Sequence, residues 1–586
     1  MEFNENQTQP ATIAAQPEPA TTPELINGSH AVIQSLIAEG VTTIFGYPGG
    51  AIMPVYDAIY DYQDQVNHIL VRHEQGAAHA AEGYARITGD VGVCLVTSGP
   101  GATNLVTGIA DAIIDSTPMV CIIGQVASHL LGTDAFQETD VMGVTIPITK
   151  WNYQITRADE IPEIIAKAFY IAKSGRPGPV LIDITKDAQQ KLMTKPFSHK
   201  KCEKLISYHP RLSPKEEQVA AAAKLINEAK KPFLFFGHGV QIAGAEQELL
   251  KLIEKTDIPA ASTLLGLSSV SVDHPNYVGW LGMHGNYGTN VLTNQCDLII
   301  AVGMRFDDRV TGDLSRYAKQ AKVVHIEIDP AEIDKIVKAD APVVGDAKKV
   351  LELLIPLVKE NKHEAWRAEF AKYNAIEDAK ITQPELAPTT EKLKMAEVIR
   401  SLSDKTKGEA VVVADVGQHQ MMTARYYQFK KPNSFITSGG LGTMGFALPA
   451  AFGAKVGAPD REVVTFIGDG CFQMTIQELG TIAQSGLPVK IIILNNNFLG
   501  MVRQWQQLFH QKRYSFVELQ NPDFITIGKG FGIDGHTCAA REDLNASLDK
   551  MLASDKPYLL EVIVEKEENV FPMVPTGACV ADIRLE

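Results

Sequence analysis

Two short segments near the C-terminus combine residue types that bind a divalent cation. Asp469 lies in Gly-Asp-Gly directly after the apolar run 463–467, and Asn496 follows a second apolar run, 489–494. Carboxylate and carboxamide oxygens suit Mg²⁺, which completes its octahedron with water or phosphate oxygens. Glycines on both sides of Asp469 let a ligand come close to the backbone. Together the two segments predict a Mg²⁺ site suited to a diphosphate.

The spacing of these two segments fits one strand–helix–strand unit. Asp469 and Asn496 lie 496 − 469 = 27 positions apart, and the segment 474–484 between them carries apolar residues at helical intervals. Because parallel strands joined by one helix end at the same edge of a sheet, both side chains should emerge next to each other. Each motif alone also fits a simple turn or a polar strand end. Their spacing favours a common site, in which Asn495 and Asn497 need be no more than turn residues.

A glycine-rich stretch at 439–445 offers a second kind of chemistry. Gly440, Gly442 and Gly445 match the dinucleotide-binding pattern Gly-x-Gly-x-x-Gly, and Asp460 follows at a suitable distance. The pattern is weak evidence, because a chain with 46 glycines contains chance matches. A nicotinamide site is therefore the less favoured interpretation of this stretch.

The elements that position these residues are short apolar strands alternating with glycine turns and helical patterns. Examples are "VGVCLVTS", "PMVCIIG" and "REVVTFIGDG". The alternation is typical of parallel sheets covered by helices, which bind ligands at the carboxyl ends of their strands. We predict an α/β chain of three doubly wound parallel-sheet domains. Their expected bounds are 25–185, 216–360 and 395–586, with polar linkers at 186–215 and 361–394 and a Pro/Thr/Ala/Gln-rich tail at 1–24 that we expect to be disordered.

The composition excludes several other classes of protein. A net charge of −15 argues against a surface for nucleic acid or anionic membranes, which needs excess Lys and Arg. The seven cysteines are scattered without a Cys-x-x-Cys pair, which fits reduced thiols and neither a disulfide framework nor a zinc site. No apolar run reaches the ~18 residues of a membrane span. The N-terminal tail lacks the basic and apolar segments of a targeting signal, so we expect a cytoplasmic protein.

Gly-Asp-Gly followed after this interval by an asparagine pair resembles the binding motif of thiamine-diphosphate-dependent enzymes. The resemblance implies that Asp469, Asn496 and the backbone carbonyl of Phe498 hold Mg²⁺ on the cofactor diphosphate. It also implies that the three units are the pyrimidine-binding, central FAD-binding and diphosphate-binding domains. Met444 resembles the bulky apolar residue that bends the cofactor, although it could also be a core methionine. The other cofactor contacts that the resemblance implies are Gly442, Gln418, His419, Gly468, Gly470 and Cys471, the last at a position often occupied by Ser.

The same resemblance gives a role to Glu74 in "HILVRHEQGAAHAAEGYA". In this family a glutamate at the end of a strand in the first domain hydrogen-bonds the aminopyrimidine ring of the cofactor. The simpler alternative is a glutamate at a helix start, where the helix dipole favours it. In the family this glutamate comes from a different subunit than the diphosphate site, which implies at least a homodimer with the active site at the subunit interface.

Five longer stretches narrow the resemblance to the acetohydroxyacid synthase (acetolactate synthase) catalytic subunits, from about residue 25 to about residue 580. It implies that Arg309 pairs with the carboxylate of the second 2-ketoacid, for which its planar fork is suited. A surface pair within Asp-Asp-Arg is the alternative. Trp505 would shape the acceptor pocket so that it favours 2-ketobutyrate over pyruvate. The stretches are "FGYPGGAIMPVYDAI", "TDAFQETD", "GMRFDDRVTGD", "SGGLGTMGFALPAA" and "NNNFLGMVRQWQ".

The resemblance implies further residues as the rest of the pocket. Gly50, Gln137 and Lys186 are implied as catalytic, and Phe136, Met501 and Val502 as substrate contacts. Met501 and Val502 could equally be core residues, and Lys186 could be a surface residue. The family also binds FAD without net redox use. The FAD contacts that the resemblance implies are Arg176, Gly237, Gly239, Met283, His284, Gly285, Arg305, Asp307 and Asp329.

The activity implied by the resemblance is a carboligation. Pyruvate is decarboxylated on thiamine diphosphate, and its hydroxyethyl unit joins a second pyruvate or 2-ketobutyrate, giving 2-acetolactate or 2-aceto-2-hydroxybutyrate for branched-chain amino-acid synthesis. A separate small regulatory subunit is an expected partner. The alternatives are a flavin-dependent pyruvate oxidase and a non-catalytic paralogue that acts as an assembly subunit. The C-terminal "PTGACVADIRLE" matches no close family pattern, so the sequence does not predict which segment covers the active site.

Overall fold

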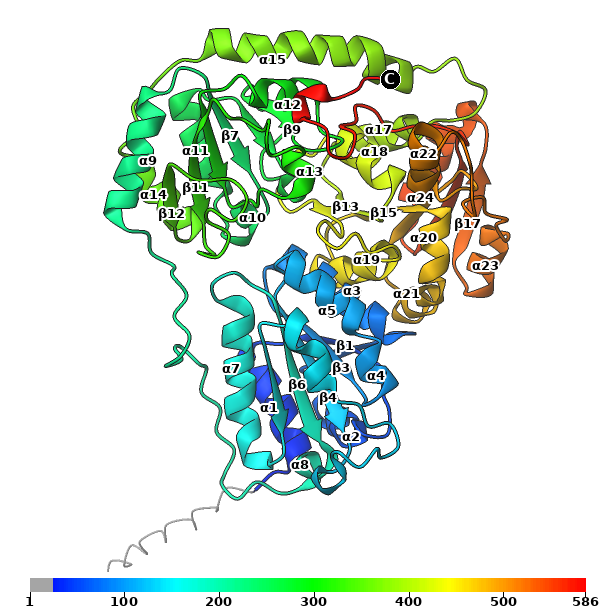
Figure 1. Cartoon of the computed structure of the whole chain (residues 1–586). Coiled ribbons are helices and arrows are strands. Elements are labelled where there is room, and N and C mark those ends of the chain that lie inside the picture. The colour runs from blue at the N-terminus through cyan, green and yellow to red at the C-terminus, as the bar shows by residue number, and fades with distance from the viewer. Residues whose placement is uncertain (1–24) are drawn as a thin grey trace, which may run out of the picture.

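The chain forms three α/β domains, each built on one six-stranded sheet (Figure 1). The computed structural model describes residues 25–586, so the predicted disordered tail lies outside the described residues. Every pairing between neighbouring strands of these sheets is parallel. The predicted fold class, three parallel-sheet α/β domains, is confirmed.

The N-terminal domain, blue and cyan in Figure 1, has the strand order β2-β1-β3-β4-β6-β5. Its inner strands are buried along their whole length, which is why they form continuous apolar runs in the sequence. Edge strand β5 is mostly half-buried, and its residues WNYQI form no such run, so the sequence pattern misses it. The strands are β1 (Thr43–Gly46), β2 (Asn67–Leu70), β3 (Gly92–Val96), β4 (Met119–Gln125), β5 (Trp151–Ile155) and β6 (Pro179–Thr185), and the helices are α1 (Gly28–Glu39), α2 (Met53–Ile59), α3 (Glu74–Thr88), α4 (Pro100–Thr103), α5 (Val106–Ile114), α6 (Val141–Thr145), α7 (Ile161–Lys173) and α8 (Lys186–Gln190).

The central domain, green in Figure 1, has the strand order β12-β11-β10-β7-β8-β9. The predicted linker 361–394 is partly helical, because Trp366 and Phe370 of α15 (Glu364–Glu377) are buried against this domain. Trp366 Nε1 also donates a hydrogen bond to the Pro232 carbonyl at 2.9 Å. The other elements are β7 (Pro232–Phe236), β8 (Ala260–Ser262), β9 (Tyr277–Trp280), β10 (Leu298–Val302), β11 (Lys322–Glu327), β12 (Ala341–Val344), α9 (Glu216–Glu228), α10 (Gly239–Ile242), α11 (Glu246–Thr256), α12 (Tyr287–Thr293), α13 (Asp308–Thr311) and α14 (Ala347–Leu354).

The C-terminal domain, yellow to red in Figure 1, has the strand order β14-β13-β15-β16-β18-β17. The segment 474–484, predicted as one helix, differs from the prediction: helix α20 begins at Asp469 and ends at Met474, and a 3₁₀ turn, η7 (Ile476–Glu478), precedes α21. The strands are β13 (Val411–Ala414), β14 (Phe435–Ile436), β15 (Val463–Gly468), β16 (Lys490–Asn495), β17 (Asp534–Cys538) and β18 (Tyr558–Ile563), and the helices are α16 (Gln383–Leu386), α17 (Met395–Lys405), α18 (Gln418–Tyr426), α19 (Ala447–Gly457), α20 (Asp469–Met474), α21 (Leu479–Ser485), α22 (Gly500–Phe509), α23 (Phe524–Gly530) and α24 (Leu544–Leu552).

Helices α3 and α19 join the N-terminal domain to the C-terminal domain (Figure 1). They cross at small residues: a Cβ on Gly83 would lie 2.1 Å from the Ala450 carbonyl oxygen, and a Cβ on Gly453 would lie 1.9 Å from the Ala80 carbonyl oxygen. Because backbone atoms occupy this space, glycine is required at both positions. The close crossing sets the place of α3, which begins at Glu74.

The C-terminal segment leaves its own domain and returns to the central domain. Cys579 forms a bridge with Gly312, and the Val574 N–H donates to the Met283 carbonyl at 2.7 Å. Arg316 and Asp582 add an ion pair of 2.7 Å. This segment therefore ties together two loops of the central domain. Within residues 25–586, no helix is both long and apolar enough to cross a membrane.

Candidate active site

The predicted cation ligands lie at the ends of two neighbouring parallel strands. Gly468 of β15 is paired with Leu494 of β16, which places Asp469 beside the asparagines. The Asp469 side chain is buried, and Asn521 Nδ2 donates to its Oδ2 at 2.6 Å. Burial raises the pKa of Asp469 to about 6. Since its partner is a neutral amide, the charge of this carboxylate can still be balanced by a cation.

The three asparagines after β16 have different roles. Asn495 Nδ2 donates to Glu561 at 2.8 Å, and its Oδ1 accepts from the Asn497 N–H at 3.1 Å, so this side chain fixes the strand end. Asn497 adopts a left-handed φ of 56°, which asparagine tolerates. Asn496 is buried and lines a small cavity together with Asp469 and Phe498. The structure thus brings the three predicted metal ligands to one cavity.

The small cavity is built for close approach to backbone atoms. A Cβ on Gly468 would lie 2.8 Å from the His419 ring, and Gly417 has a φ of 152°. The His419 Nε2 atom is buried and has no hydrogen-bond partner among residues 25–586, and burial lowers the pKa of this histidine to about 3. A neutral imidazole, a buried carboxylate and an amide oxygen fit a metal-bound diphosphate. Of the other predicted cofactor contacts, Gln418, His419, Gly468, Gly470 and Cys471 line this cavity, and Gly442 does not.

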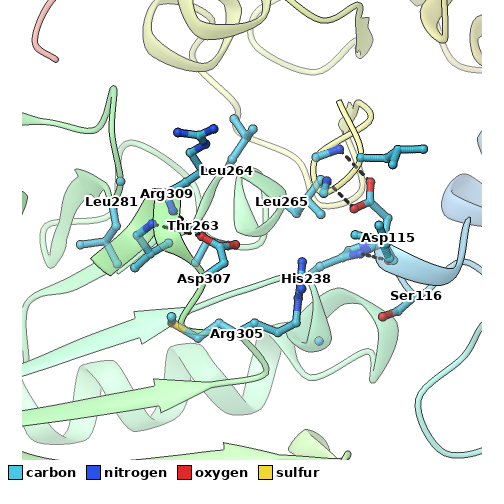
Figure 2. A pocket seen from close by; sticks show the side chains of 18 of the residues that line it. Asp115, Ser116, His238, Thr263, Leu264, Leu265, Leu281, Arg305, Asp307 and Arg309 are labelled. Atoms are coloured by element: carbon cyan, nitrogen blue, oxygen red, sulfur yellow. Dashed lines mark hydrogen bonds between the residues drawn. The ribbon is translucent and has the colours of Figure 1, made fainter. Parts of the chain in front are cut away.

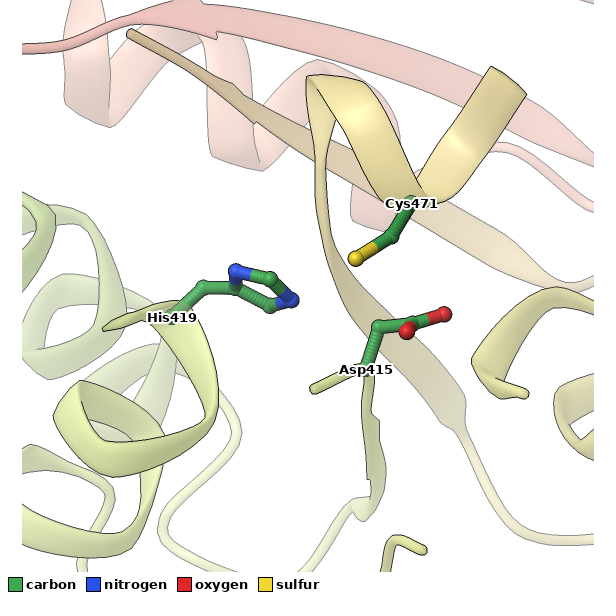
Figure 3. Close-up of side chains that lie close together, drawn as sticks. All are labelled: Asp415, His419 and Cys471. Atoms are coloured by element: carbon green, nitrogen blue, oxygen red, sulfur yellow. The ribbon is translucent and has the colours of Figure 1, made fainter. Parts of the chain in front are cut away.

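A second cluster beside this cavity, Asp415, His419 and Cys471, is shown in Figure 3. Both oxygens of Asp415 are occupied by backbone donors: the N–H groups of Val416 and Gly445 bind Oδ1 at 2.8 and 2.9 Å, and the Ala447 N–H binds Oδ2 at 2.9 Å. Asp415 therefore holds the loop that leads into α19. We assign this cluster a structural role and not that of a second metal site.

A large cavity of about 980 Å³ lies where the three domains meet. Figure 2 shows Asp307 and Arg309 of the central domain on one side and Asp115 and Ser116 of the N-terminal domain on the other. Met444, Met501 and Val502 belong to the walls of both cavities, so the metal loop and the large cavity adjoin. The large cavity is lined by these predicted site residues: Arg176, Gly239, Met283, His284, Arg305, Asp307, Arg309, Gly442, Met444, Met501, Val502 and Trp505.

Some predicted contacts with FAD do not line the large cavity. They are Gly237, Gly285 and Asp329, the last of which is paired with Arg176 at 3.5 Å. The wall also contains residues that the sequence reasoning misses. Asp115 is one of them: its carboxylate accepts the N–H groups of Gly439 and Gly440 at 2.8 and 2.7 Å. Others are Ser116, Thr263, Leu264 and Leu265.

Burial shapes the charges of the large cavity. It lowers the pKa of His238 and His284 to about 4, so both rings are neutral at pH 7. It raises the pKa of Glu327 to about 7. Asp307 caps α13 by accepting the Arg309 N–H at 3.0 Å. The Arg309 side chain is 61% exposed, and its nearest carboxylate, Asp308, lies 3.7 Å away and is 80% exposed. Arg309 is thus a cation available to an anionic ligand.

Glu74, Gly50 and Gln137 gather at a different place, the carboxyl edge of the N-terminal sheet. Asn104 Nδ2 donates to Glu74 Oε2 at 2.9 Å. The Thr97 hydroxyl accepts the N–H that follows Gly50 at 3.3 Å, and a Cβ on Gly99 would lie 2.8 Å from the Gln137 carbonyl oxygen. Phe136 is exposed in the same loop, and Lys186 follows β6 at the same edge. None of these residues lines either cavity. Within one chain, the predicted site residues therefore form two separate groups.

Three family models match the chain in succession. They are the thiamine pyrophosphate enzyme N-terminal TPP binding domain (residues 26–144), the central domain (residues 219–354) and the C-terminal TPP binding domain (residues 415–562). Thiamine pyrophosphate is another name for thiamine diphosphate. The fold and the diphosphate-type cavity define the chain as a thiamine pyrophosphate enzyme.

Similar proteins identify the branch of the thiamine pyrophosphate enzymes to which the chain belongs. The chain is 46% identical to the acetolactate synthase large subunit of Corynebacterium glutamicum, over 99% of this chain and 93% of that protein. It is 47% identical to the acetolactate synthase isozyme 2 large subunit of Escherichia coli, over 94% and 98%. A probable acetolactate synthase large subunit of Methanocaldococcus jannaschii is 45% identical over 95% of both chains. The chain belongs to the family of acetolactate synthase large subunits.

Proposed function

We propose that this chain is the catalytic subunit of an acetolactate synthase. It decarboxylates pyruvate and joins the two-carbon product to a second pyruvate or to 2-ketobutyrate, giving 2-acetolactate or 2-aceto-2-hydroxybutyrate. The observation that carries the proposal is the contact between the two cavities. The oxygen ligands Asp469, Asn496 and Phe498 line one cavity, the cation Arg309 lines the other, and Met501 borders both.

Thiamine diphosphate supplies a nucleophilic carbon and an electron sink, chemistry that the side chains of a protein lack. The chain's own residues bind and orient. Asp469, Asn496 and the Phe498 carbonyl would hold Mg²⁺ for the diphosphate. Arg309 binds the carboxylate of the acceptor ketoacid, since a guanidinium pairs with a carboxylate through two hydrogen bonds. Met501, Val502 and Trp505 form the apolar wall around the acceptor.

Glu74 acts on the pyrimidine ring bound by a second copy of the chain. Its Oε2 is occupied by Asn104, so Oε1 is the oxygen that would hold a proton for the pyrimidine ring of the bound cofactor. Because Glu74 lies outside both cavities of its own chain, we propose a homodimer or a larger assembly in which each site combines Glu74, Gly50 and Gln137 of one chain with the metal loop of the other.

We propose that FAD occupies the part of the large cavity that lies between the central and N-terminal domains. A volume of about 980 Å³ exceeds the need of a three- or four-carbon acid and lies in the range of cofactor sites. Arg176, His284 and Asp307 line the large cavity with polar groups. The relatives are named as large subunits, which supports a separate small regulatory subunit as a partner of this chain.

A product assay tests this function. The purified chain is given pyruvate and 2-ketobutyrate together, with thiamine diphosphate, Mg²⁺ and FAD omitted in turn. We expect both acetohydroxyacids with all three present and no product without thiamine diphosphate or Mg²⁺. Release of CO₂ with stoichiometric reduction of the flavin, and no acetohydroxyacid, would instead identify a pyruvate oxidase.

A further inference from the structure

A buried glutamate of the C-terminal domain contacts the start of the helix that carries Glu74. Glu478 is fully buried in η7, 478 − 469 = 9 positions after Asp469. Its two carboxylate oxygens accept the backbone N–H of Arg72 at 3.1 and 3.3 Å. Arg72 lies two residues before Glu74, in the turn that leads into α3. A carboxylate of one domain thus binds the turn that leads into a helix of another domain.

The space around this carboxylate is closely fitted. A Cβ on Gly76, in the first turn of α3, would lie 2.5 Å from Glu478 Oε1. On its own side, the Thr481 hydroxyl donates to Glu478 Oε2 at 2.6 Å and orients the carboxylate. Burial raises the pKa of Glu478 to about 7. A carboxylate near the N-terminus of a helix is favoured by the helix dipole, which partly offsets the cost of burying it.

The side chain of Arg72 strengthens the same junction. Its guanidinium donates to the Gly480 carbonyl at 3.1 Å and to Gln484 at 2.6 Å, both in α21. The first turn of α3 does not need Glu478 for its own capping, because His73 Nδ1 already accepts the Gln75 N–H at 3.2 Å. His73 therefore caps the helix locally, and the contact of Glu478 with Arg72 is a separate connection between two domains.

We propose that Glu478 is a positioning residue for Glu74, which holds the start of α3 so that the Glu74 carboxyl group reaches the pyrimidine ring in the correct place. This inference rests on the proposed function, in which Glu74 exchanges a proton with that ring. Glu478 lines neither cavity, so it acts through α3 and not on the cofactor. A displacement of about 1 Å at a reacting group lowers rates by up to roughly 100-fold, so a small shift of α3 is enough to matter.

The test measures how fast the thiazolium C2 proton exchanges with deuterium in the holoenzyme, by acid quench and NMR. This step depends on the place of Glu74 and precedes substrate binding. For Glu478→Gln we expect the exchange rate and kcat to fall at least about tenfold, with unchanged stoichiometry of bound thiamine diphosphate. Thr481→Val and Gly76→Ala disturb the same contact from its two sides and should slow the exchange in the same direction, whether or not Glu478→Gln folds.

Asp257→Asn is the matched control. Asp257 is also a buried carboxylate that accepts a backbone N–H at a helix start, that of His363 at 2.8 Å, but it lies in the central domain away from both cavities. The Asp257→Asn substitution should lower Tm and leave the exchange rate within about twofold of that of the unsubstituted protein. If the variants at the Glu478 contact lower Tm with the exchange rate unchanged, Glu478 is only structural and the inference is wrong. Glu74→Gln separates the role of Glu74 from that of Glu478. An unchanged exchange rate in Glu74→Gln overturns the role of Glu74 itself. If exchange is slow in Glu74→Gln but normal in the variants at the Glu478 contact, only the role of Glu478 is overturned.

Discussion

At the scale of single residues, Arg309 shows how a charged side chain is kept available for a ligand. Its backbone is held twice, since its N–H donates to Asp307 at 3.0 Å and its carbonyl accepts the Met283 N–H at 2.8 Å. Its side chain stays largely exposed on the wall of the large cavity. A fixed backbone with a free guanidinium is an arrangement that suits recognition of a carboxylate.

Replacement of Arg309 tests this role. A hydrogen-bonded charge pair contributes about 1.5–3 kcal/mol, so Arg309→Met should lower kcat/KM for the acceptor ketoacid by roughly 10- to 150-fold. Steady-state kinetics with 2-ketobutyrate as the varied acceptor measure the effect. Asp308→Asn is the control, because it removes the exposed partner of Arg309 and should change kcat/KM little. Equal, small effects in both variants would indicate that Asp308 and Arg309 are only a surface pair.

Asp183 predicts a dependence of stability on pH. This carboxyl group is buried in β6, and burial raises its pKa to about 6, although Gln154 and Gln125 donate to its Oδ2. Because the pKa is raised in the folded state, the stabilisation is complete below the unfolded pKa near 4 and is lost as the pH rises through 6. Asp183→Asn removes this dependence. Its Tm relative to the unsubstituted protein should therefore increase between pH 4.5 and pH 7.5.

For Asp159→Asn we expect the opposite change of relative Tm with pH, so this variant serves as the comparison. The Thr194 hydroxyl donates to Asp159 at 2.7 Å and lowers the pKa of this exposed group. Its stabilisation is present above the unfolded pKa near 4 and is lost as the pH falls below it, so the Tm of the variant relative to the unsubstituted protein should be lower at pH 4.5 than at about pH 3. Thermal scans of the Asp183 variant at pH 4.5 and pH 7.5, and of the Asp159 variant at about pH 3 and pH 4.5, measure the two changes. A relative Tm that changes in the same direction with rising pH in both variants would contradict the assignment.

At the scale of elements, the crossing of α3 and α19 positions Glu74 relative to the rest of its chain (Figure 1). Gly453→Ala would place a Cβ 1.9 Å from the Ala80 carbonyl oxygen, and backbone cannot yield without moving the helix. Overpacking of this kind costs about 1–3 kcal/mol. We expect a lower Tm together with a lower kcat, because α3 carries Glu74.

Gly530→Ala is the control for this substitution. Gly530 also lies in a helix, α23, and a Cβ there would meet no atom within 4 Å. Alanine favours helices over glycine by about 1 kcal/mol, so this variant should be as stable as the unsubstituted protein or slightly more so. Unchanged Tm and kcat in Gly453→Ala, measured in the same scans and assays, would show that the crossing tolerates a larger residue.

The elements also show what sequence alone can predict. Strands β15 and β16 are apolar runs joined by one short connection, so local sequence predicts that Asp469 and Asn496 lie side by side. Edge strands such as β5 are only partly buried and lack such runs. Asp115 and Ser116 meet the large cavity only because the domains pack together, and no local pattern signals this. Glu478 stands in an ordinary helical sequence, and only its contact with Arg72 sets it apart.

At the scale of the whole molecule, the separation of the predicted site residues into two groups is the main feature. The metal loop lines a cavity of the C-terminal domain and Arg309 lines the cavity where the three domains meet, whereas Glu74 lies at the edge of the N-terminal sheet outside both cavities. In a symmetric dimer, Glu74 of each chain would lie next to the metal loop of the other chain, which gives two equivalent active sites. One chain alone would then be inactive although it carries every residue that the reaction needs.

Complementation between two inactive variants tests this account most directly. In a mixed dimer of Glu74→Gln and Asp469→Asn chains, one site carries both substitutions and the other carries neither. We expect each variant alone to form no acetolactate from pyruvate. After co-refolding in equal amounts, about half of the dimers are mixed and half of their sites are intact, so roughly a quarter of the full activity should return. If the mixture stays inactive while mixed dimers are present, Glu74 and the metal loop do not form a shared site and the account is wrong.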